Sequence, residues 1–147
     1  MKSFKQHIFE KLRVNKQSYT LFPKTKYELM QMIKDEISKN GNRCSLNHID
    51  VSKITDMSRL FYNSDFNGDI SEWDVSNVEN MMRLFAYSKF NGDISNWDVS
   101  NVIYMSGMFA HSDFNGDISN WDVSNVKDMK EMFNYSPLEK NPPKWYK

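Results

Sequence analysis

The chain has 147 residues, and its 19 lysines and arginines balance its 19 aspartates and glutamates. No net charge therefore directs it towards nucleic acid or an anionic surface. Aromatic residues make up 14% of the chain and there are ten methionines, which is enough apolar material for a core and disfavours disorder. The one cysteine, Cys44, excludes an internal disulfide and favours a reducing compartment.

The N-terminal stretch carries an apolar stripe at helical spacing. Phe4, Ile8 and Leu12 are four residues apart, and Phe9 lies beside them. This pattern predicts an amphipathic helix with basic residues on its other face. Three interpretations stay open: a helix packed on the body of the protein, a docking element for a partner, or a disordered segment.

Membrane and export signals are not expected. No apolar run approaches the ~18–20 residues of a membrane-spanning helix, and the first residues contain no uninterrupted apolar region of a secretion signal. The expected location is therefore the cytoplasm of the cell that makes the chain, or a larger assembly that carries it.

A second helix is expected over residues 26–39. Thr25 and Glu28 have the spacing of a capping box, and Asn40 and Gly41 form a helix stop. Because an array of repeats exposes the apolar edge of its first unit, we expect this helix to cap that edge.

The rest of the chain repeats every 24 residues. Three copies of F-N-G-D-I-S-x-W-D-V-S-N-V begin at Phe66, Phe90 and Phe114, and each is completed by M-x-x-[LM]-F. A degenerate first copy covers residues 42–65, where Cys44 takes the place of the motif glycine. We interpret Cys44 as a small, partly buried thiol. A fixed period of this length indicates a repeat architecture.

Each repeat is interpreted as a short strand, a turn and a short helix. The apolar residues Val78, Met81, Leu84 and Phe85 have the spacing of one helix face. The predicted fold is therefore α/β: a right-handed leucine-rich-repeat-like solenoid of about four 24-residue strand–helix repeats with an N-terminal helical cap. The expected units are an N-terminal helix and linker (1–21), a capping helix (22–41), the solenoid (42–137, in repeats 42–65, 66–89, 90–113 and 114–137) and a C-terminal cap (138–147). Phenylalanines and tryptophans of successive repeats are expected to stack in ladders.

The repeated motif resembles that of the BspA-type leucine-rich-repeat surface proteins of bacteria, whose unit is F-N-x-D-I-S-x-W-D-V-S-N-V-x-x-M-x-x-M-F-x-x-S. The resemblance covers roughly residues 22–147. It implies a solenoid used for binding, commonly on cell surfaces, and it carries over no catalytic residue. Without an export signal, the chain is more similar to short members of the family, some of which are encoded by bacteriophages.

The repeated aspartates have two interpretations. Asp69, Asp93 and Asp117 form one set of equivalent positions, and their carboxylates either accept hydrogen bonds from turn amides or bind a cation such as calcium. We favour the amides, because no stretch has the spacing of a calcium loop. No cofactor and no metal site are expected.

Positions that vary between repeats are the candidates for contact with a partner, although they are also free to drift. They are Tyr87, Ile103, Tyr104, His111 and Tyr135. The predicted function is non-enzymatic protein binding or structural attachment, with Phe4, Ile8, Phe9 and Leu12 as a separate docking surface. Nucleic acid is not an expected partner, because the repeats lack a basic face. The alternatives are a virion-associated phage protein and an exported bacterial adhesin.

Overall fold

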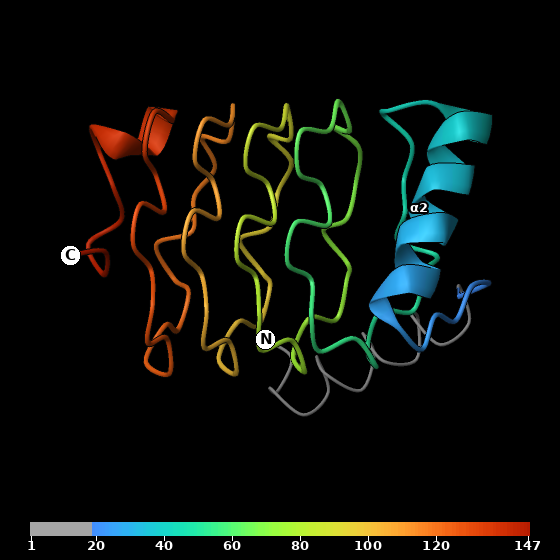
Figure 1. The fold of residues 1–147 in the computed structure, drawn as a ribbon, viewed down its shortest axis with the longest axis horizontal. Helices are drawn as coiled ribbons and strands as arrows, with labels where there is room; N and C mark the ends of the chain where they lie inside the picture. Colours follow the sequence, from blue (N-terminus) through green and yellow to red (C-terminus); the bar gives the residue numbers. More distant parts are fainter. Residues whose placement is uncertain (1–18) are drawn as a thin grey trace, which may run out of the picture.

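The computed structural model describes residues 19–147. Within this range, helix α2 spans Lys26–Asn40 and a 3-10 turn, η1, spans Pro137–Glu139. The remainder is a stack of irregular coils, one per repeat, with α2 at one end and the C-terminal residues at the other (Figure 1). The predicted N-terminal helix surface of Phe4, Ile8, Phe9 and Leu12 lies outside the described residues.

The predicted α/β fold of strand–helix repeats is wrong. Within residues 19–147, α2 is the single α-helix. Backbone hydrogen bonds join the coils, but they produce only isolated parallel bridges and no continuous strands, so there is no sheet. These bridges are Leu21–Ile49, Ser45–Asp69, Asp56–Asn80, Asn80–Tyr104 and Tyr104–Asp128. The capping helix, expected over residues 26–39, is present.

The alternation of backbone hydrogen bonds explains why no helix forms after residue 78. Met81 and Phe85 donate their N–H groups to carbonyls of the next coil, whereas Leu84 donates to Met81, only three residues back. An α-helix needs every N–H for the carbonyl four residues back. Since half of the backbone N–H donors of this segment bond to a neighbouring coil, the segment forms a series of tight turns, and its apolar spacing fits these turns as well as a helix.

The turns use left-handed backbone conformations. The third residue of the Met81–Leu84 turn, Arg83, has φ 53°, and the third residue of the Phe85–Ser88 turn, Tyr87, has φ 59°. A positive φ at this position is typical of type II turns, which prefer glycine or asparagine there. The same turns recur in the other coils, with positive φ at Arg59, Asn63, Gly107, His111, Glu131 and Tyr135.

Stacked aromatic rings fill the core, as expected. Phe66, Phe90 and Phe114 stack with ring centroids 6.2 Å apart at each step. A second ladder of phenylalanines has steps of 5.7–5.8 Å and comprises Phe61, Phe85, Phe109 and Phe133. These rings are at most 1% exposed, so each coil buries its apolar face only against its neighbours.

Close backbone packing between coils requires glycine at residue 68. A Cβ atom built there would lie 1.9 Å from the carbonyl oxygen of Cys44 and 2.7 Å from the Phe66 ring. The motif glycine therefore permits the coils to approach.

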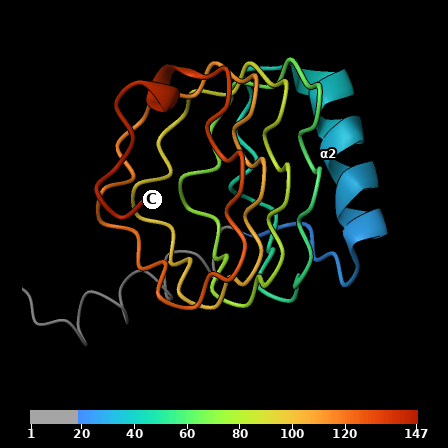
Figure 2. The same ribbon diagram turned by 60° about the vertical axis from the view of Figure 1, so that its left-hand side comes forward.

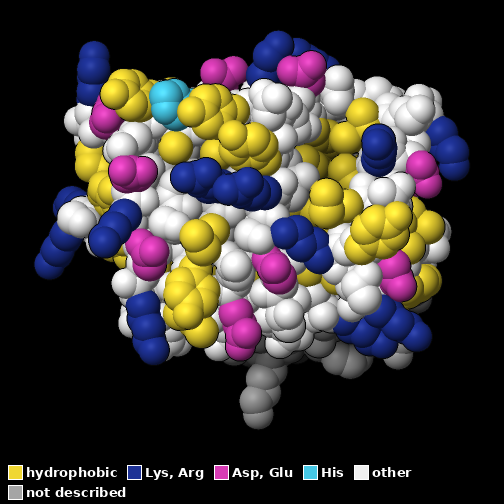
Figure 3. Space-filling view, in the orientation of Figure 1, with side chains coloured by type: hydrophobic (Ala, Val, Ile, Leu, Met, Phe, Trp, Pro, Cys, Tyr) yellow, Lys and Arg dark blue, Asp and Glu magenta, His cyan; other side chains and the backbone are white. Residues whose placement is uncertain are grey.

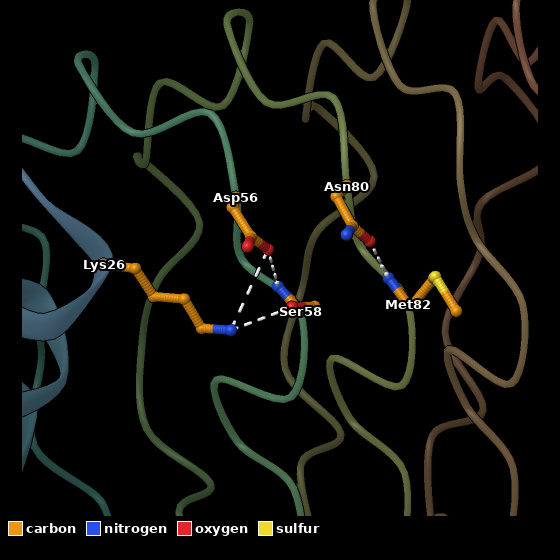
Figure 4. Close-up of polar contacts among 5 residues, drawn as sticks. All are labelled: Lys26, Asp56, Ser58, Asn80 and Met82. Atoms are coloured by element: carbon orange, nitrogen blue, oxygen red, sulfur yellow. Dashed lines mark hydrogen bonds and ion pairs between the residues drawn. The ribbon is translucent and has the colours of Figure 1, made fainter.

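Helix α2 covers the first coil. Leu29 and Ile33 are buried against the core. The ammonium of Lys26 donates to the Ser58 hydroxyl at 2.8 Å and lies 3.9 Å from the Asp56 carboxylate (Figure 4). Apolar burial and these polar contacts together fix α2 on the stack.

The last residues continue the register of the repeats. The indole N–H of Trp145 donates to the Ile118 carbonyl at 2.9 Å, and its ring stacks on Trp121 at 6.3 Å. Trp73, Trp97 and Trp121 make the same hydrogen bond 27 residues back. Trp145 thus occupies the tryptophan position of a fifth coil.

Candidate partner-binding surface

A row of aromatic side chains follows one edge of the stack on its outside. The rings of Tyr87 and His111 stack with centroids 4.5 Å apart, and those of His111 and Tyr135 are 4.6 Å apart. Tyr62 meets Tyr87 edge-on at 5.6 Å. We call Tyr62, Tyr87, His111 and Tyr135 the aromatic row. Figure 3 shows a histidine between hydrophobic side chains along the upper edge of one face.

The row is exposed although its rings touch. The exposed fractions of Tyr62, Tyr87 and Tyr135 are 41%, 49% and 73%. Their coils are held in place by the buried phenylalanine ladders, so the rings are presented by a fixed scaffold. Exposed large aromatic side chains in a contiguous group are typical of interaction surfaces.

The backbone turns determine where each ring points. Tyr87, His111 and Tyr135 share the left-handed position of the second turn, and the equivalent residue of the first coil is Asn63, with φ 54°. Tyr62 therefore enters the row from one residue earlier. This offset accounts for its edge-on contact with Tyr87, in contrast to the stacking of the other rings.

The stacking limits what the row can recognise. Because the faces of Tyr87 and His111 lie against neighbouring rings, the row presents ring edges, tyrosine hydroxyls and imidazole nitrogens to a partner. A sugar or a nucleobase binds by stacking on open ring faces. His111 has a stacked ring on each side, whereas Tyr135 has a stacked ring on one side only among the described residues.

Charged side chains lie beside the row. The guanidinium carbon of Arg59 is 5.5 Å from the centroid of the Tyr62 ring, a cation–π contact. Arg59 also lines a shallow depression across successive coils, together with Arg83, Lys130, Asp128 and Glu131. At the Tyr62 end, a partner on the row would thus meet the positive charge of Arg59 beside the ring edges.

Two predicted contact residues lie elsewhere. Tyr104 is exposed and takes part in the bridges to Asn80 and Asp128, and Ile103 lines a different depression with Glu79 and Lys127. The segment that carries them was predicted as the short helix of its repeat, but the structure forms turns there. Within residues 19–147 the structure brings together Tyr87, His111 and Tyr135 but does not add Ile103 or Tyr104 to their ring contacts.

The aspartates of the repeats stabilise turns, as we favoured. Asp93 Oδ1 accepts the N–H of Ser95 at 3.0 Å and its hydroxyl at 2.6 Å. Asp69 and Asp117 accept the same pair of bonds from Ser71 and Ser119. The serine hydrogen bonds lower the pKa of these three carboxyls, and that of Asp122.

The described part of the chain holds no cluster of three or more histidine, cysteine, aspartate or glutamate side chains suited to a metal ion. Cys44 is half-buried, and burial, with the nearby Glu36 carboxylate, raises the pKa of its thiol. A raised pKa reduces the fraction of reactive thiolate.

Sequence reasoning missed the turns that build the row. The asparagine at residue 63 and the glycine at residue 107 were the available signal, because both residue types tolerate a positive φ. Arg59, which contacts Tyr62, was not among the candidate residues.

Comparisons with known proteins give a family for the chain. No curated protein matches the sequence, and no solved structure matches it. No helix within residues 19–147 is long and apolar enough to cross a membrane. One family model, described as "Mycoplasma protein of unknown function, DUF285", matches residues 27–145. This match begins at the second residue of α2 and covers all the coils, and the chain belongs to the DUF285 family.

Proposed function

We propose that the chain is a non-enzymatic protein-binding or attachment module whose partner contacts the aromatic row. The observation that carries the proposal is the unbroken contact of four exposed rings from four successive coils. The resemblance to BspA-type repeat proteins, which we extend here as part of the proposal, supports a binding role.

Pre-stacked rings are suited to binding. Tyrosine offers a large contact area with few rotatable bonds, and a ring held by its neighbours loses little further freedom when a partner arrives. Hydroxyl groups at the ring edges add directional hydrogen bonds. We therefore expect Tyr87 and His111, in the middle of the row, to contribute most to affinity.

The test replaces the row without disturbing the turns. Asparagine already occupies the equivalent left-handed position at residue 63, so Tyr87→Asn, His111→Asn and Tyr135→Asn are compatible with the backbone. Tagged full-length chains with and without the three substitutions are purified from native cells, and bound proteins are quantified by mass spectrometry. We expect recovery of a specific partner to fall at least about tenfold in the triple variant.

A matched control separates the row from exposed tyrosine in general. Tyr27 lies on α2 and is 72% exposed, so Tyr27→Asn removes a similar ring from another surface. Recovery should be unchanged in this variant, and all chains should have the same Tm. If the triple variant retains the partner as well as the unmodified chain does, the aromatic row is not the binding surface.

The stripe of Phe4, Ile8, Phe9 and Leu12 is proposed as a second, separate contact. A chain lacking residues 1–16 tests it in the same purification. A partner that is lost only with this truncation depends on the stripe, and one that is lost only with the triple variant depends on the row.

A further inference from the structure

The end of the stack opposite α2 exposes a row of backbone donors. In the third coil, Met105, Gly107, Phe109 and His111 donate their N–H groups to carbonyls of the fourth coil at 2.8–2.9 Å. The equivalent N–H groups of the fourth coil have no acceptor among residues 19–147; they belong to Met129, Glu131, Phe133 and Tyr135. We call residues 123–135 the open edge.

Apolar side chains are also uncovered along the open edge. Val78 and Val102 are completely buried, but the equivalent Val126 is only half-buried. Met81 and Met105 are completely buried, whereas Met129 is half-buried. Each repeat–repeat contact in the chain combines the backbone ladder with these side chains, so the open edge has the surface of an interface that continues through the stack.

The C-terminal residues cover only the other half of this end, which Figure 2 turns toward the viewer. Trp145 stacks on Trp121, and Tyr146 meets the Phe133 ring edge-on at 4.9 Å. Their contacts follow the first half of a coil, with the tryptophan in register. The second half of that coil has no counterpart among the described residues.

The polarity of the edge excludes symmetric pairing of two copies. Two open edges facing each other would place N–H groups against N–H groups. The opposite end of a second copy, where the carbonyls of the first coil face outward, is covered by α2 through Leu29 and Ile33. The occupant must instead present carbonyl oxygens at alternate residues.

We propose that the open edge is a docking site for a partner polypeptide that adds to the stack by backbone pairing. The segment runs parallel to residues 127–135 and offers alternate carbonyls to the four N–H groups. It also offers one N–H to the Lys127 carbonyl, just as Lys127 donates to the Ile103 carbonyl at 2.8 Å. Its apolar side chains cover Val126 and Met129. This is recognition by addition to an exposed edge.

This inference goes beyond the proposed function, because it concerns the backbone of the open edge and not the outer rings of the aromatic row. The two are tested by different variants. Tyr135 belongs to both surfaces, so the comparison uses the double variant Tyr87→Asn and His111→Asn, which leaves the open edge intact. Substitution of Met129 leaves the central rings of the row intact.

A peptide with the sequence of one of the chain's own coils can test binding to the open edge. A fluorescein-labelled peptide of residues 75–88 contains the carbonyls of Asn80, Met82, Leu84 and Ala86, which accept from the first coil in the structure. We expect it to bind the full-length chain in fluorescence anisotropy. In hydrogen exchange followed by NMR, the amides of Met129, Glu131, Phe133 and Tyr135 should exchange fast in the free chain and slowly in the complex.

Two controls isolate backbone pairing. A peptide with esters after Asn80 and Leu84 keeps every side chain but weakens two acceptor carbonyls, and we expect it to bind about tenfold more weakly. Met129→Asp should weaken binding similarly, whereas Met30→Asp, at an exposed methionine of α2, should have no effect.

Three results would overturn the proposal. The first is no binding up to about 1 mM peptide, which corresponds to a negligible affinity. The second is equal binding of the ester peptide, which would mean that only apolar contact is involved. The third is a dimer of the free chain in sedimentation that Met129→Asp dissociates, which would make a second copy the occupant.

Discussion

At the scale of single residues, the aspartate–serine turns make the stability of the fold depend on pH. Hydrogen bonds from serine lower the pKa of Asp69, Asp93, Asp117 and Asp122 in the folded chain. In the unfolded chain these carboxyls lose the serine donors and titrate at about 3.9. The unfolded chain therefore binds more protons in this range, and the free energy of unfolding falls as the pH drops.

We expect the contribution of these turns to be fully present above the unfolded pKa and to be lost as the pH falls through the lower folded values. Urea unfolding between about pH 7 and about pH 2.5 measures the change. The triple variant Ser71→Ala, Ser95→Ala and Ser119→Ala should lose stability at neutral pH and show a weaker dependence on acid. An unchanged acid dependence in this variant would contradict the role assigned to the serines.

At the scale of an element, the tryptophans at equivalent positions of the coils allow an interior ring, Trp97, to be compared with the terminal ring, Trp145. Trp97 is 4% exposed, donates to the Ile70 carbonyl at 3.1 Å and has a coil on each side. Trp97→Ala should destabilise the chain by about 3–5 kcal/mol, because it leaves a cavity and an unpaired carbonyl. Trp145 is half-buried at the end of this series, and Trp145→Ala should cost about 1–2 kcal/mol.

Thermal and urea unfolding of both variants measure these costs. Equal costs would mean that the coils do not depend on ring contacts from both sides, and a cost below about 1 kcal/mol for Trp97→Ala would contradict the stacked core.

Two elements of the fold, the aromatic ladders and the capping helix, could be predicted from the sequence. Because Phe66 and Phe90 are one 24-residue period apart, they occupy equivalent places in successive coils whatever the local backbone conformation. The ladders could therefore be predicted from the period alone. The capping helix followed from Thr25 and Glu28, whose hydrogen bond at 3.1 Å begins α2. Both inferences depend only on spacing and on local polar chemistry.

The helix predicted within each repeat failed because its pattern was ambiguous. Val78, Met81 and Phe85 point to one side both in a helix and in turns that alternate between local and inter-coil hydrogen bonds. Only partners from other coils decide between them, and these partners lie 23 residues away in the sequence. The aromatic row could be predicted only in part. Tyr87, His111 and Tyr135 share one position of the repeat, whereas Tyr62 lies one position earlier and joins them through the geometry of its turn.

At the scale of the whole molecule, each coil contacts only its two neighbours, so one complete coil should be dispensable. Deletion of residues 90–113 joins Lys89 to Phe114 in the same way that Asp113 precedes Phe114 in the intact chain. Every ladder then loses one member and keeps its register. Because stability in such arrays is approximately a sum over units and their interfaces, we expect a folded chain with a lower Tm and a smaller urea m value.

A deletion of half a period provides the matched comparison. Removal of residues 102–113 takes away half as many residues, but it joins Asn101 to Phe114. The tryptophan half of the fourth repeat is then placed where the deleted Met105 half had been, against the wrong half of the neighbouring coil. This shorter deletion should abolish cooperative unfolding and the slow hydrogen exchange of the inter-coil amides, whereas the longer deletion should preserve both. If the 24-residue deletion unfolds the chain as completely as the 12-residue deletion does, the coils depend on one another beyond their nearest neighbours, and the additive picture of the stack fails.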